Sequence, residues 1–181
     1  MKTMFEALEL ATRAHHGQTR NHDEIGLPYI LHPIRVAKAT WEELGVCYNA
    51  ESCLGYLEKY AAVALLHDVL EDTSVTEEQM IEIVGLHVTN LVKQLTNPSK
   101  GSPELRAVRK AKDREHLRTV ENEIKIIKML DRIDNLQTMR TAPKEFKTLY
   151  LEESRLLAET IGNAHPDLKK KLLKTIEDLH K

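Results

Sequence analysis

The sequence has few of the features that mark secreted, membrane-spanning or nucleic-acid-binding proteins. Its two cysteines, Cys47 and Cys53, are too few for a disulfide framework and form no C-x-x-C pair. No segment is apolar over the length that a bilayer requires, and the amino terminus lacks the apolar stretch of a signal peptide. A net charge of −2 gives no general attraction to nucleic acid or to an anionic membrane. We therefore expect a cytoplasmic protein with neither nucleic acid polymers nor membranes as partners.

The composition is that of a compact globular protein, with 41% hydrophobic and 30% charged residues. A chain of 181 residues buries enough apolar surface to fold without a disulfide or a structural metal. We therefore expect a single domain over 1–181, in which any bound metal is catalytic rather than structural.

Apolar residues recur at intervals of three and four along most of the chain, and alternating runs of β-branched and aromatic residues are almost absent. This pattern predicts an all-α fold. The first expected helix runs from a Thr3–Glu6 capping box to Arg13, and the second starts within 28–33, buries Val36 and Ala37 and ends at Gly45. A third is expected over 59–72, and a fourth is capped by Thr76 and Gln79. A long helical region then runs from Ser102 and Pro103 towards Met139, and after an interruption at Pro143 two more helices follow over 144–161 and 166–180.

The most specific local pattern is LLHDVLEDT, at the end of the helix predicted over 59–72. An apolar helix avoids ionisable groups at its buried end unless they are paired or bind a metal. His67 and Asp68 are neighbours, and the residues one helical turn later are Glu71 and Asp72. The first pair suits a cation and the second suits proton transfer. The alternative is a solvated acidic helix end, which the HD dipeptide alone would favour.

A second pattern, IIKMLDRIDNLQTM, places Asp131, Asn135 and Thr138 on one helical face at i, i+4 and i+7. This pattern is weak by itself and gains weight only beside the first. The alternative for Asp131 is a salt-bridged surface group, with Arg132 or Arg140 as its partner.

The third pattern is HHGQTRNHDEIGLPYILHPIRVA, in which Arg20 lies in a polar stretch and His32 precedes a first-turn proline. As a metal ligand, His32 would complete a set of two imidazoles and two carboxylates with His67, Asp68 and Asp131. Such a mixed nitrogen and oxygen set suits Mn²⁺, Fe²⁺ or a related ion. A histidine before proline often has no special role, which is the alternative here.

These segments resemble the HD-domain hydrolases of the RelA/SpoT type, especially the small alarmone hydrolases. The resemblance extends over about 11–150 and rests on four segments in order: H-x-G-Q-x-R at His15 to Arg20, P-Y-I-x-H-P at Pro28 to Pro33, A-L-L-H-D-V-x-E-D-T at Ala64 to Thr73, and L-D-R-x-x-N-x-x-T at Leu130 to Thr138. A joint match of four ordered segments is highly specific.

The resemblance implies an HD-domain helical bundle that binds one Mn²⁺ and hydrolyses a small nucleotide. The implied reaction removes the 3′-diphosphate of (p)ppGpp and releases pyrophosphate and GDP or GTP; synthetase activity is not expected. The matching residues are His32, His67, Asp68 and Asp131 for the metal, Glu71 and Asp72 for positioning or deprotonating the attacking water, and Arg20, Asn135, Thr138 and, more loosely, Tyr150 for the substrate.

The chain departs from the family pattern near the expected phosphate path. Asn21 stands where the family usually has lysine, and extra residues follow it up to Gly26. Asp134 and Gln137 replace a usual histidine and arginine, so positive charge is lost. Because the metal ligands and the acidic pair are kept, we expect hydrolysis to be retained with altered substrate selectivity.

Two other functions remain open from the sequence. One is an HD phosphohydrolase that acts on a different nucleotide, guanine or adenine. The other is a non-enzymatic module that senses a nucleotide or keeps a structural metal, an idea that the presence of Glu71 and Asp72 disfavours.

Overall fold

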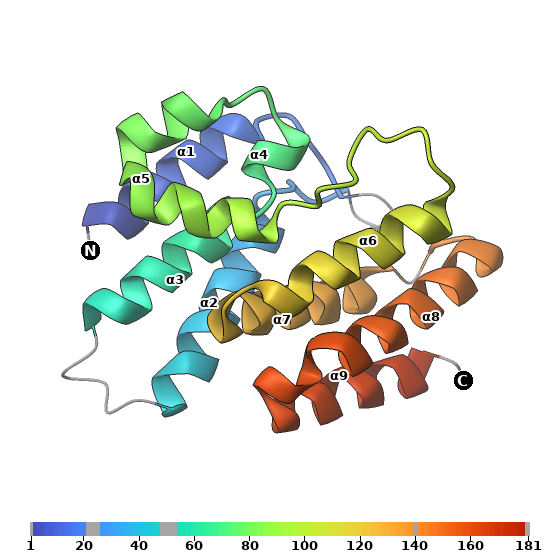
Figure 1. The fold of residues 1–181 in the computed structure, drawn as a ribbon. Coiled ribbons are helices and arrows are strands. Elements are labelled where there is room, and N and C mark those ends of the chain that lie inside the picture. The colour runs from blue at the N-terminus through green and yellow to red at the C-terminus, as the bar shows by residue number, and fades with distance from the viewer. Residues whose placement is uncertain (1, 21–25, 48–53, 140, 180–181) are drawn as a thin grey trace. The chain divides into compact units, whose positions relative to one another are not determined.

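The structure, a computed structural model, describes residues 2–20, 26–47, 54–139 and 141–179. Contacts divide the chain into two compact units, which we describe separately. Unit 1 comprises 1–19 and 27–96, and unit 2 comprises 20–26 and 97–181. The described elements are helices, apart from an isolated bridge between Thr19 and Pro28 (Figure 1). The predicted all-α fold is confirmed.

Unit 1 is built around one strongly apolar helix. Its elements are α1 (Lys2–Ala14), α2 (Leu31–Cys47), α3 (Leu54–Leu66), α4 (Val69–Asp72) and α5 (Glu77–Leu95). Every residue of α3 from Tyr60 to Leu66 is buried, and α3 packs against α1, α2 and α5. A helix that is apolar on all sides is stable only inside a core. The carboxyl end of α3 is therefore held firmly on several sides.

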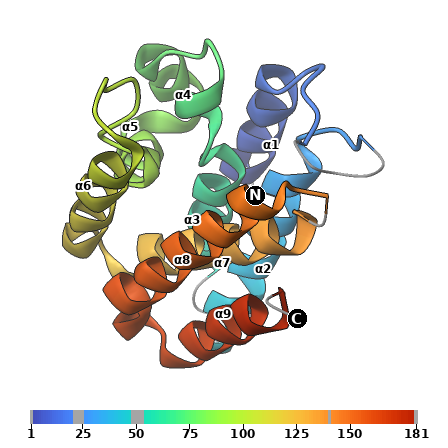
Figure 2. The ribbon, with the colours of Figure 1, turned by 90° about the vertical axis from the view of Figure 1, so that its right-hand side faces the viewer.

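Unit 2 is built around α7 (Asn122–Thr138), which packs against α8 (Lys144–Ile161) and α9 (Pro166–Leu179). The remaining elements are α6 (Arg106–Thr119), which packs against α8, and the short 3₁₀ helix η2 (Gly162–Ala164). Helices α8 and α9 lie side by side in two perpendicular views (Figures 1 and 2). Gly162 joins them, and a Cβ atom there would lie 2.5 Å from Lys169 Cδ, so this corner favours glycine.

Several helix boundaries follow the sequence signals closely. Thr76 and Gln79 form the predicted capping box, in which each side chain accepts a hydrogen bond from the other residue's backbone N–H. The helices expected over 144–161 and 166–180 are α8 and α9, although His180 lies outside the described residues. Val36 and Ala37 are buried, as predicted.

Two predicted helix ends near the amino terminus are wrong. Helix α1 already begins at Lys2, so Thr3 lies inside the helix and does not cap it. Helix α2 continues past Gly45 to Cys47, because a glycine within a helix weakens it without ending it. The side chain of Cys47 and all of Cys53 lie outside what the structure describes.

The long helix predicted from Ser102 to Met139 is also wrong. The Ser102 hydroxyl accepts a hydrogen bond from the Glu104 backbone N–H, which makes a local turn rather than a helix cap, and α6 begins only at Arg106. The chain is extended at Val120 (φ −79°, ψ 163°), which separates α6 from α7. The buried Val120 side chain, 7% exposed, anchors this break.

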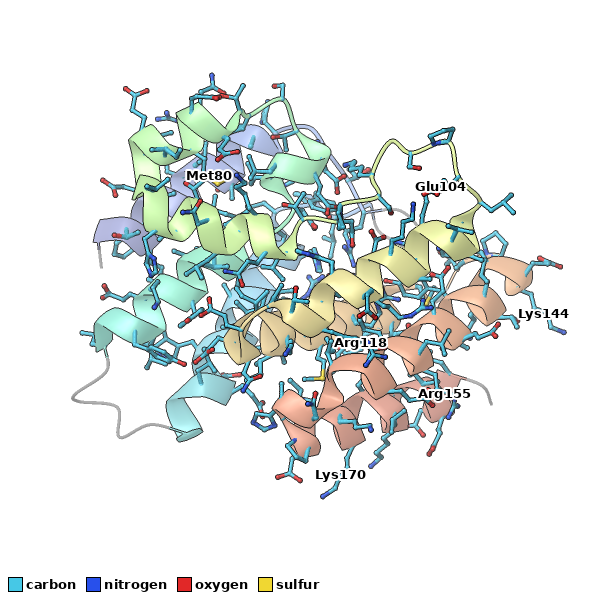
Figure 3. All side chains as sticks on the ribbon, in the orientation of Figure 1. Met80, Glu104, Arg118, Lys144, Arg155 and Lys170 are labelled. Atoms are coloured by element: carbon cyan, nitrogen blue, oxygen red, sulfur yellow. The ribbon has the colours of Figure 1, made fainter. Side chains whose placement is uncertain are left out.

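The faces of the helices sort apolar from charged side chains as expected for a globular fold. Met80 of α5 is fully buried, whereas Lys144, Arg155 and Lys170 are exposed and carry their charges outward (Figure 3). None of the described helices is long and apolar enough to cross a membrane.

Candidate functional site

Helix α3 is interrupted at the HD dipeptide. Helix α3 ends at Leu66, His67 and Asp68 form a turn, and the short helix α4 follows, so the single helix predicted over 59–72 is wrong. The cause is a side chain: Nδ1 of His67 lies 2.7 Å from the Ala64 carbonyl oxygen. A continuous helix would use that carbonyl for the Asp68 N–H. The ring of His67 therefore takes the place of a backbone hydrogen bond.

Three of the predicted metal ligands meet in unit 1. One donor atom each from His32, His67 and Asp68 lies within 4.8 Å of the other two. The two Nε2 atoms are 3.2 Å apart, and Asp68 Oδ2 lies 2.9 Å from His67 Nε2 and 3.6 Å from His32 Nε2. Both histidines are buried, with exposed fractions of 0% and 2%, while the Asp68 side chain is 14% exposed. The structure thus brings these three residues together, and their role as metal ligands stays a prediction.

The chemistry of this cluster fits a divalent cation. Because the Ala64 carbonyl accepts a hydrogen bond from His67 Nδ1, the neutral ring carries its proton there and keeps a lone pair on Nε2. Metal-binding histidines are typically oriented in this way, by a hydrogen bond from the second ring nitrogen. Two imidazole nitrogens and a carboxylate oxygen suit first-row transition ions. The group is thus a possible metal site with its lone pairs directed inward.

Residues to which the sequence analysis gave no role surround this cluster. The Tyr29 hydroxyl donates a hydrogen bond of 2.5 Å to Asp68 Oδ2. The Tyr29 ring lies 4.7 Å from the ring of His15, whose Nδ1 is 2.8 Å from Gln18 Oε1. His15, Gln18 and Tyr29 occupy fixed positions of the quoted segments H-x-G-Q-x-R and P-Y-I-x-H-P, and this motif was the signal that could have identified them.

The acidic pair lies directly beyond the turn that His67 and Asp68 form. Glu71 is half-buried and Asp72 is exposed, and the Asp72 backbone N–H donates to the Asp68 carbonyl at 2.8 Å. Gln18 Nε2 donates to the Asp72 carbonyl at 3.0 Å, which ties α4 to the segment that follows α1. The backbone of both carboxylates is therefore well held, one turn after His67 and Asp68. Their role in proton transfer stays a prediction.

The fourth predicted ligand, Asp131, belongs to α7 of unit 2. It is 4% exposed, so the alternative of a surface group does not describe it. Asn135 Nδ2 donates to Asp131 Oδ1 at 2.5 Å, and Lys128 Nζ lies 3.0 Å from Asp131 Oδ2. Each carboxylate oxygen has two lone pairs, so these contacts leave capacity for a cation. Its place in the metal site stays a prediction.

Three of the four predicted substrate-contacting residues, all except Tyr150, form one network in unit 2. Arg20 Nη2 donates to Asn135 Oδ1 and to Thr138 Oγ1, both at 2.8 Å. The same nitrogen lies 3.7 Å from Asp134 Oδ2, and both side chains are almost buried, with exposed fractions of 8% and 9%. The sequence prediction that Asn135 and Thr138 share a helix face is thus confirmed, and Asn135 links Arg20 to Asp131.

The residues that depart from the family pattern lie in different environments. Asp134, which stands where the family usually has histidine, forms an ion pair with Arg20 and offsets the positive charge of its guanidinium. Gln137 is exposed on α7. Asn21 and the inserted residues up to 25 lie outside the described residues.

Arg132, considered above as a partner of Asp131, points elsewhere. Its Nη1 donates to Ser154 Oγ at 3.1 Å, and its guanidinium carbon lies 4.3 Å from the centroid of the Tyr150 ring. The ring of Phe146 stacks at 5.7 Å from that of Tyr150. Burial raises the pKa of the Tyr150 phenol, although the nearby Arg132 charge opposes this. Contact of Tyr150 with a nucleoside stays a prediction, and Arg140 lies outside the described residues.

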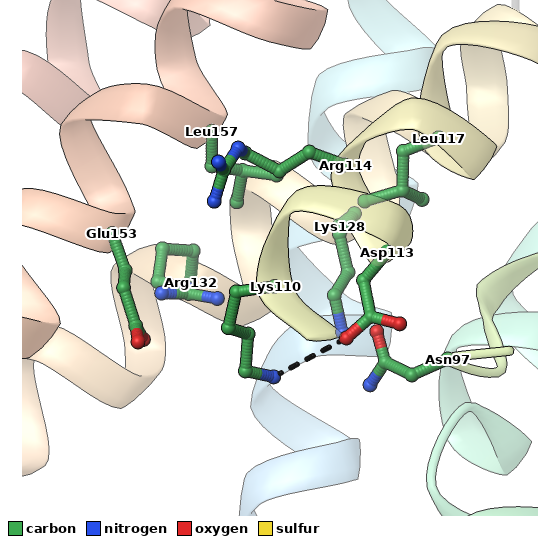
Figure 4. Close-up of a pocket in the computed structure, with 9 residues that line it drawn as sticks. All are labelled: Asn97, Lys110, Asp113, Arg114, Leu117, Lys128, Arg132, Glu153 and Leu157. Carbon is green, nitrogen blue, oxygen red and sulfur yellow. Dashed lines mark ion pairs between the residues drawn. The ribbon is translucent and has the colours of Figure 1, made fainter. Parts of the chain in front are cut away.

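A small charged pocket in unit 2 lies beside these residues (Figure 4). Lys128, the partner of Asp131, lines it together with Lys110, whose Nζ is 3.6 Å from Asp113 Oδ2. Burial lowers the pKa of Lys110, an effect that Asp113 opposes and the nearby Arg132 and Lys128 charges reinforce. Lys128 thus connects Asp131 to a cluster of packed charges, which limits the movement of the Asp131 side chain.

Comparison with known proteins places the chain in a family. The model of the HD domain matches residues 7–159. A guanosine-3′,5′-bis(diphosphate) 3′-pyrophosphohydrolase of Spiroplasma citri is 33% identical over 99% of this chain, and the similarly named MESH1 protein of Danio rerio is 30% identical over 83%. The match covers 22% of the Spiroplasma protein and 77% of MESH1, so the chain spans about a fifth of the first and most of the second.

A solved structure has the same fold. It belongs to a metazoan ortholog of SpoT, has a TM-score of 0.80 and 24% identity, and the match covers 98% of this chain and 96% of the other. Because the family model matches most of the chain, and MESH1, named a guanosine-3′,5′-bis(diphosphate) 3′-pyrophosphohydrolase, is 30% identical over most of both proteins, the chain belongs to the HD-domain hydrolases of the RelA/SpoT type.

Proposed function

We propose that this protein is a metal-dependent phosphohydrolase that removes the 3′-diphosphate of (p)ppGpp-like nucleotides, releasing pyrophosphate and GDP or GTP. The observation that carries the proposal is the convergence of His32, His67 and Asp68 within 4.8 Å. The named activities of the Spiroplasma and Danio relatives support the choice of substrate. We further propose that 1–181 acts as one domain, since the family match at 7–159 runs through both units.

The proposed metal is Mn²⁺, held by His32, His67, Asp68 and Asp131. When bound, such a cation would polarise a phosphoryl oxygen and make a water molecule more acidic. The first three residues already direct their donor atoms towards one another. The Asp131 carboxylate is oriented by Asn135 and Lys128, as the outer contacts of a metal ligand usually are.

The protein side chains proposed to act on the substrate form two groups. Glu71 and Asp72 would orient the attacking water and take its proton, because they follow the metal-site turn immediately. Arg20 would bind a phosphate group with its guanidinium, held in place by Asn135 and Thr138. We assign Asn135, Thr138 and Tyr150 to the substrate as well, with Tyr150 nearest the nucleoside.

The test is a product assay on the full chain with Mn²⁺ and ppGpp. The expected result is equal release of pyrophosphate and GDP, abolished by a chelator and restored by Mn²⁺. His16→Ala, which changes an exposed histidine outside the cluster, is the matched control for His67→Ala. Release of inorganic phosphate instead of pyrophosphate would contradict the proposed bond cleavage.

Two alternatives give different results in the same assay. A hydrolase for another nucleotide would leave ppGpp intact and release pyrophosphate or phosphate from an adenine analogue. Arg20, which is proposed to bind a phosphate of the substrate, is buried in an ion pair with Asp134. This ion pair is the structural reason to test other nucleotides. A sensing module would bind the nucleotide and release no product from any of them.

A further inference from the structure

Tyr29 occupies a position that no role assigned above explains. Its hydroxyl donates to Asp68 Oδ2 at 2.5 Å, a length typical of a hydrogen bond to a charged carboxylate. Oδ2 is also the oxygen that faces the imidazoles, 2.9 Å from His67 Nε2. Tyr29 therefore contacts the donor atom itself rather than the far oxygen of the carboxylate.

The Tyr29 side chain is held in this position on several sides. Its backbone N–H donates to the Gln18 carbonyl at 2.9 Å, next to the bridge between Thr19 and Pro28. Its ring lies 4.7 Å from His15 and 5.7 Å, edge-on, from His32. Because ring and backbone are both anchored, the hydroxyl is aimed at Asp68 before any ligand binds.

Asp68 needs such support more than the histidines do. His32 and His67 are buried, and the ring of His67 is oriented by Ala64. The Asp68 side chain is 14% exposed, against 1% for each imidazole. The terminal torsion of an aspartate is broad, so the hydrogen bond from Tyr29 restricts which oxygen faces the imidazoles.

We propose that Tyr29 is a positioning residue for the cation, which fixes Asp68 so that Oδ2 faces His32 and His67. This inference rests on the metal site of the proposed function and adds a residue to it. A carboxylate oxygen has two lone pairs, so Oδ2 can accept from Tyr29 and still offer a lone pair to a cation. Tyr29 thereby lowers the entropy that Asp68 loses when a cation binds.

The experiment is a Mn²⁺ titration of the full chain, with free Mn²⁺ measured by its paramagnetic resonance signal. Tyr29→Phe removes the hydroxyl and keeps the ring contacts. Loss of a contact that orients a metal ligand typically weakens binding by about 10- to 100-fold, and we expect a fall of this size in Mn²⁺ affinity. Activity should return at high Mn²⁺, because the defect lies in occupancy. Unfolding of the metal-free variant should change little.

Tyr56→Phe is the control, since it removes the same hydroxyl in the same unit, about 15 Å from the end of α3 by helix rise. Equal Mn²⁺ affinity in Tyr29→Phe and the parent would overturn the inference and leave the proposed function standing. An equal loss in both tyrosine variants would also overturn it. A parent protein that binds no Mn²⁺ would overturn the proposed metal site together with the inference.

Discussion

His67→Ala tests the proposed cation site at the proposed ligand whose orientation is best defined. The change removes a buried imidazole, 2% exposed, and its 2.7 Å contact with the Ala64 carbonyl. Large-to-small changes in cores cost about 2–5 kcal/mol. A domain has about 5–15 kcal/mol of stability, so the variant is expected to fold, with reduced stability in the absence of metal.

The larger effect should appear when Mn²⁺ is added. At a concentration about 1,000 times Kd, the ion stabilises the parent by about 4.1 kcal/mol. Loss of a side chain that only orients a metal ligand weakens metal binding by up to about 100-fold, and loss of the ligand itself should weaken it at least as much. At about 10 times Kd the stabilisation is only about 1.4 kcal/mol by the same relation. For a chain of this size, the difference lowers the Mn²⁺-induced rise in Tm by about 5–11 °C.

The assay is thermal unfolding of parent and variant with and without Mn²⁺. His87→Ala, at an exposed position of α5, serves as the control and should keep the parental rise in Tm. A Mn²⁺-induced rise in Tm of His67→Ala as large as that of the parent would show that His67 contributes nothing to binding the ion.

Three further predictions concern turnover, substrate binding and pH. Glu71→Gln and Asp72→Asn should keep Mn²⁺ and nucleotide binding but lower kcat by about 10²- to 10⁴-fold. A normal rate of pyrophosphate release would show that Glu71 and Asp72 have no role in catalysis. Arg20→Ala should raise KM for ppGpp more than it weakens Mn²⁺ binding; an unchanged KM would remove Arg20 from the substrate site. Burial raises the folded-state pKa of Tyr150 above its ordinary value of 10.0. The stability that the buried neutral phenol contributes is therefore complete below pH 10 and is lost as pH rises further. Tyr150→Phe should therefore reduce the loss of stability above pH 10 in urea unfolding, and an unchanged alkaline slope would exclude Tyr150 as its source.

The parts of the fold that the sequence predicts are those with local causes. The capping box of Thr76 and Gln79 spans only three residues, and Pro143 and Pro166 restrict the chain wherever they occur. Such signals act through neighbouring backbone groups, so they can be recognised without knowing the tertiary structure. The all-α fold likewise follows from periodicity alone.

The errors arise where a side chain competes with the backbone or with a distant segment. The end of α3 depends on the His67 ring taking the Ala64 carbonyl, which no helix propensity anticipates. The break at Val120 is accompanied by burial of its side chain, which only the packed unit provides. Both features are tertiary in origin.

The candidate site shows the same division. The motifs correctly group His32, His67 and Asp68, although 35 residues separate the two histidines. They do not reveal the hydrogen bond of Tyr29, because a motif shows which residues recur and not which atoms meet. The pairing of Arg20 with Asp134 is likewise invisible, since it joins segments more than a hundred residues apart.

The position of two proposed metal ligands just after α3 would restrict how this chain can evolve. The residues from Tyr60 to Leu66 are buried, and His67 and Asp68 follow them without a flexible connection. A substitution that repacks this helix would shift the donor atoms even if it cost little stability. Exposed positions such as Leu86, by contrast, can vary without such an effect. If His67 and Asp68 bind the cation, substitutions in the core of unit 1 are limited by the geometry of that site as well as by folding.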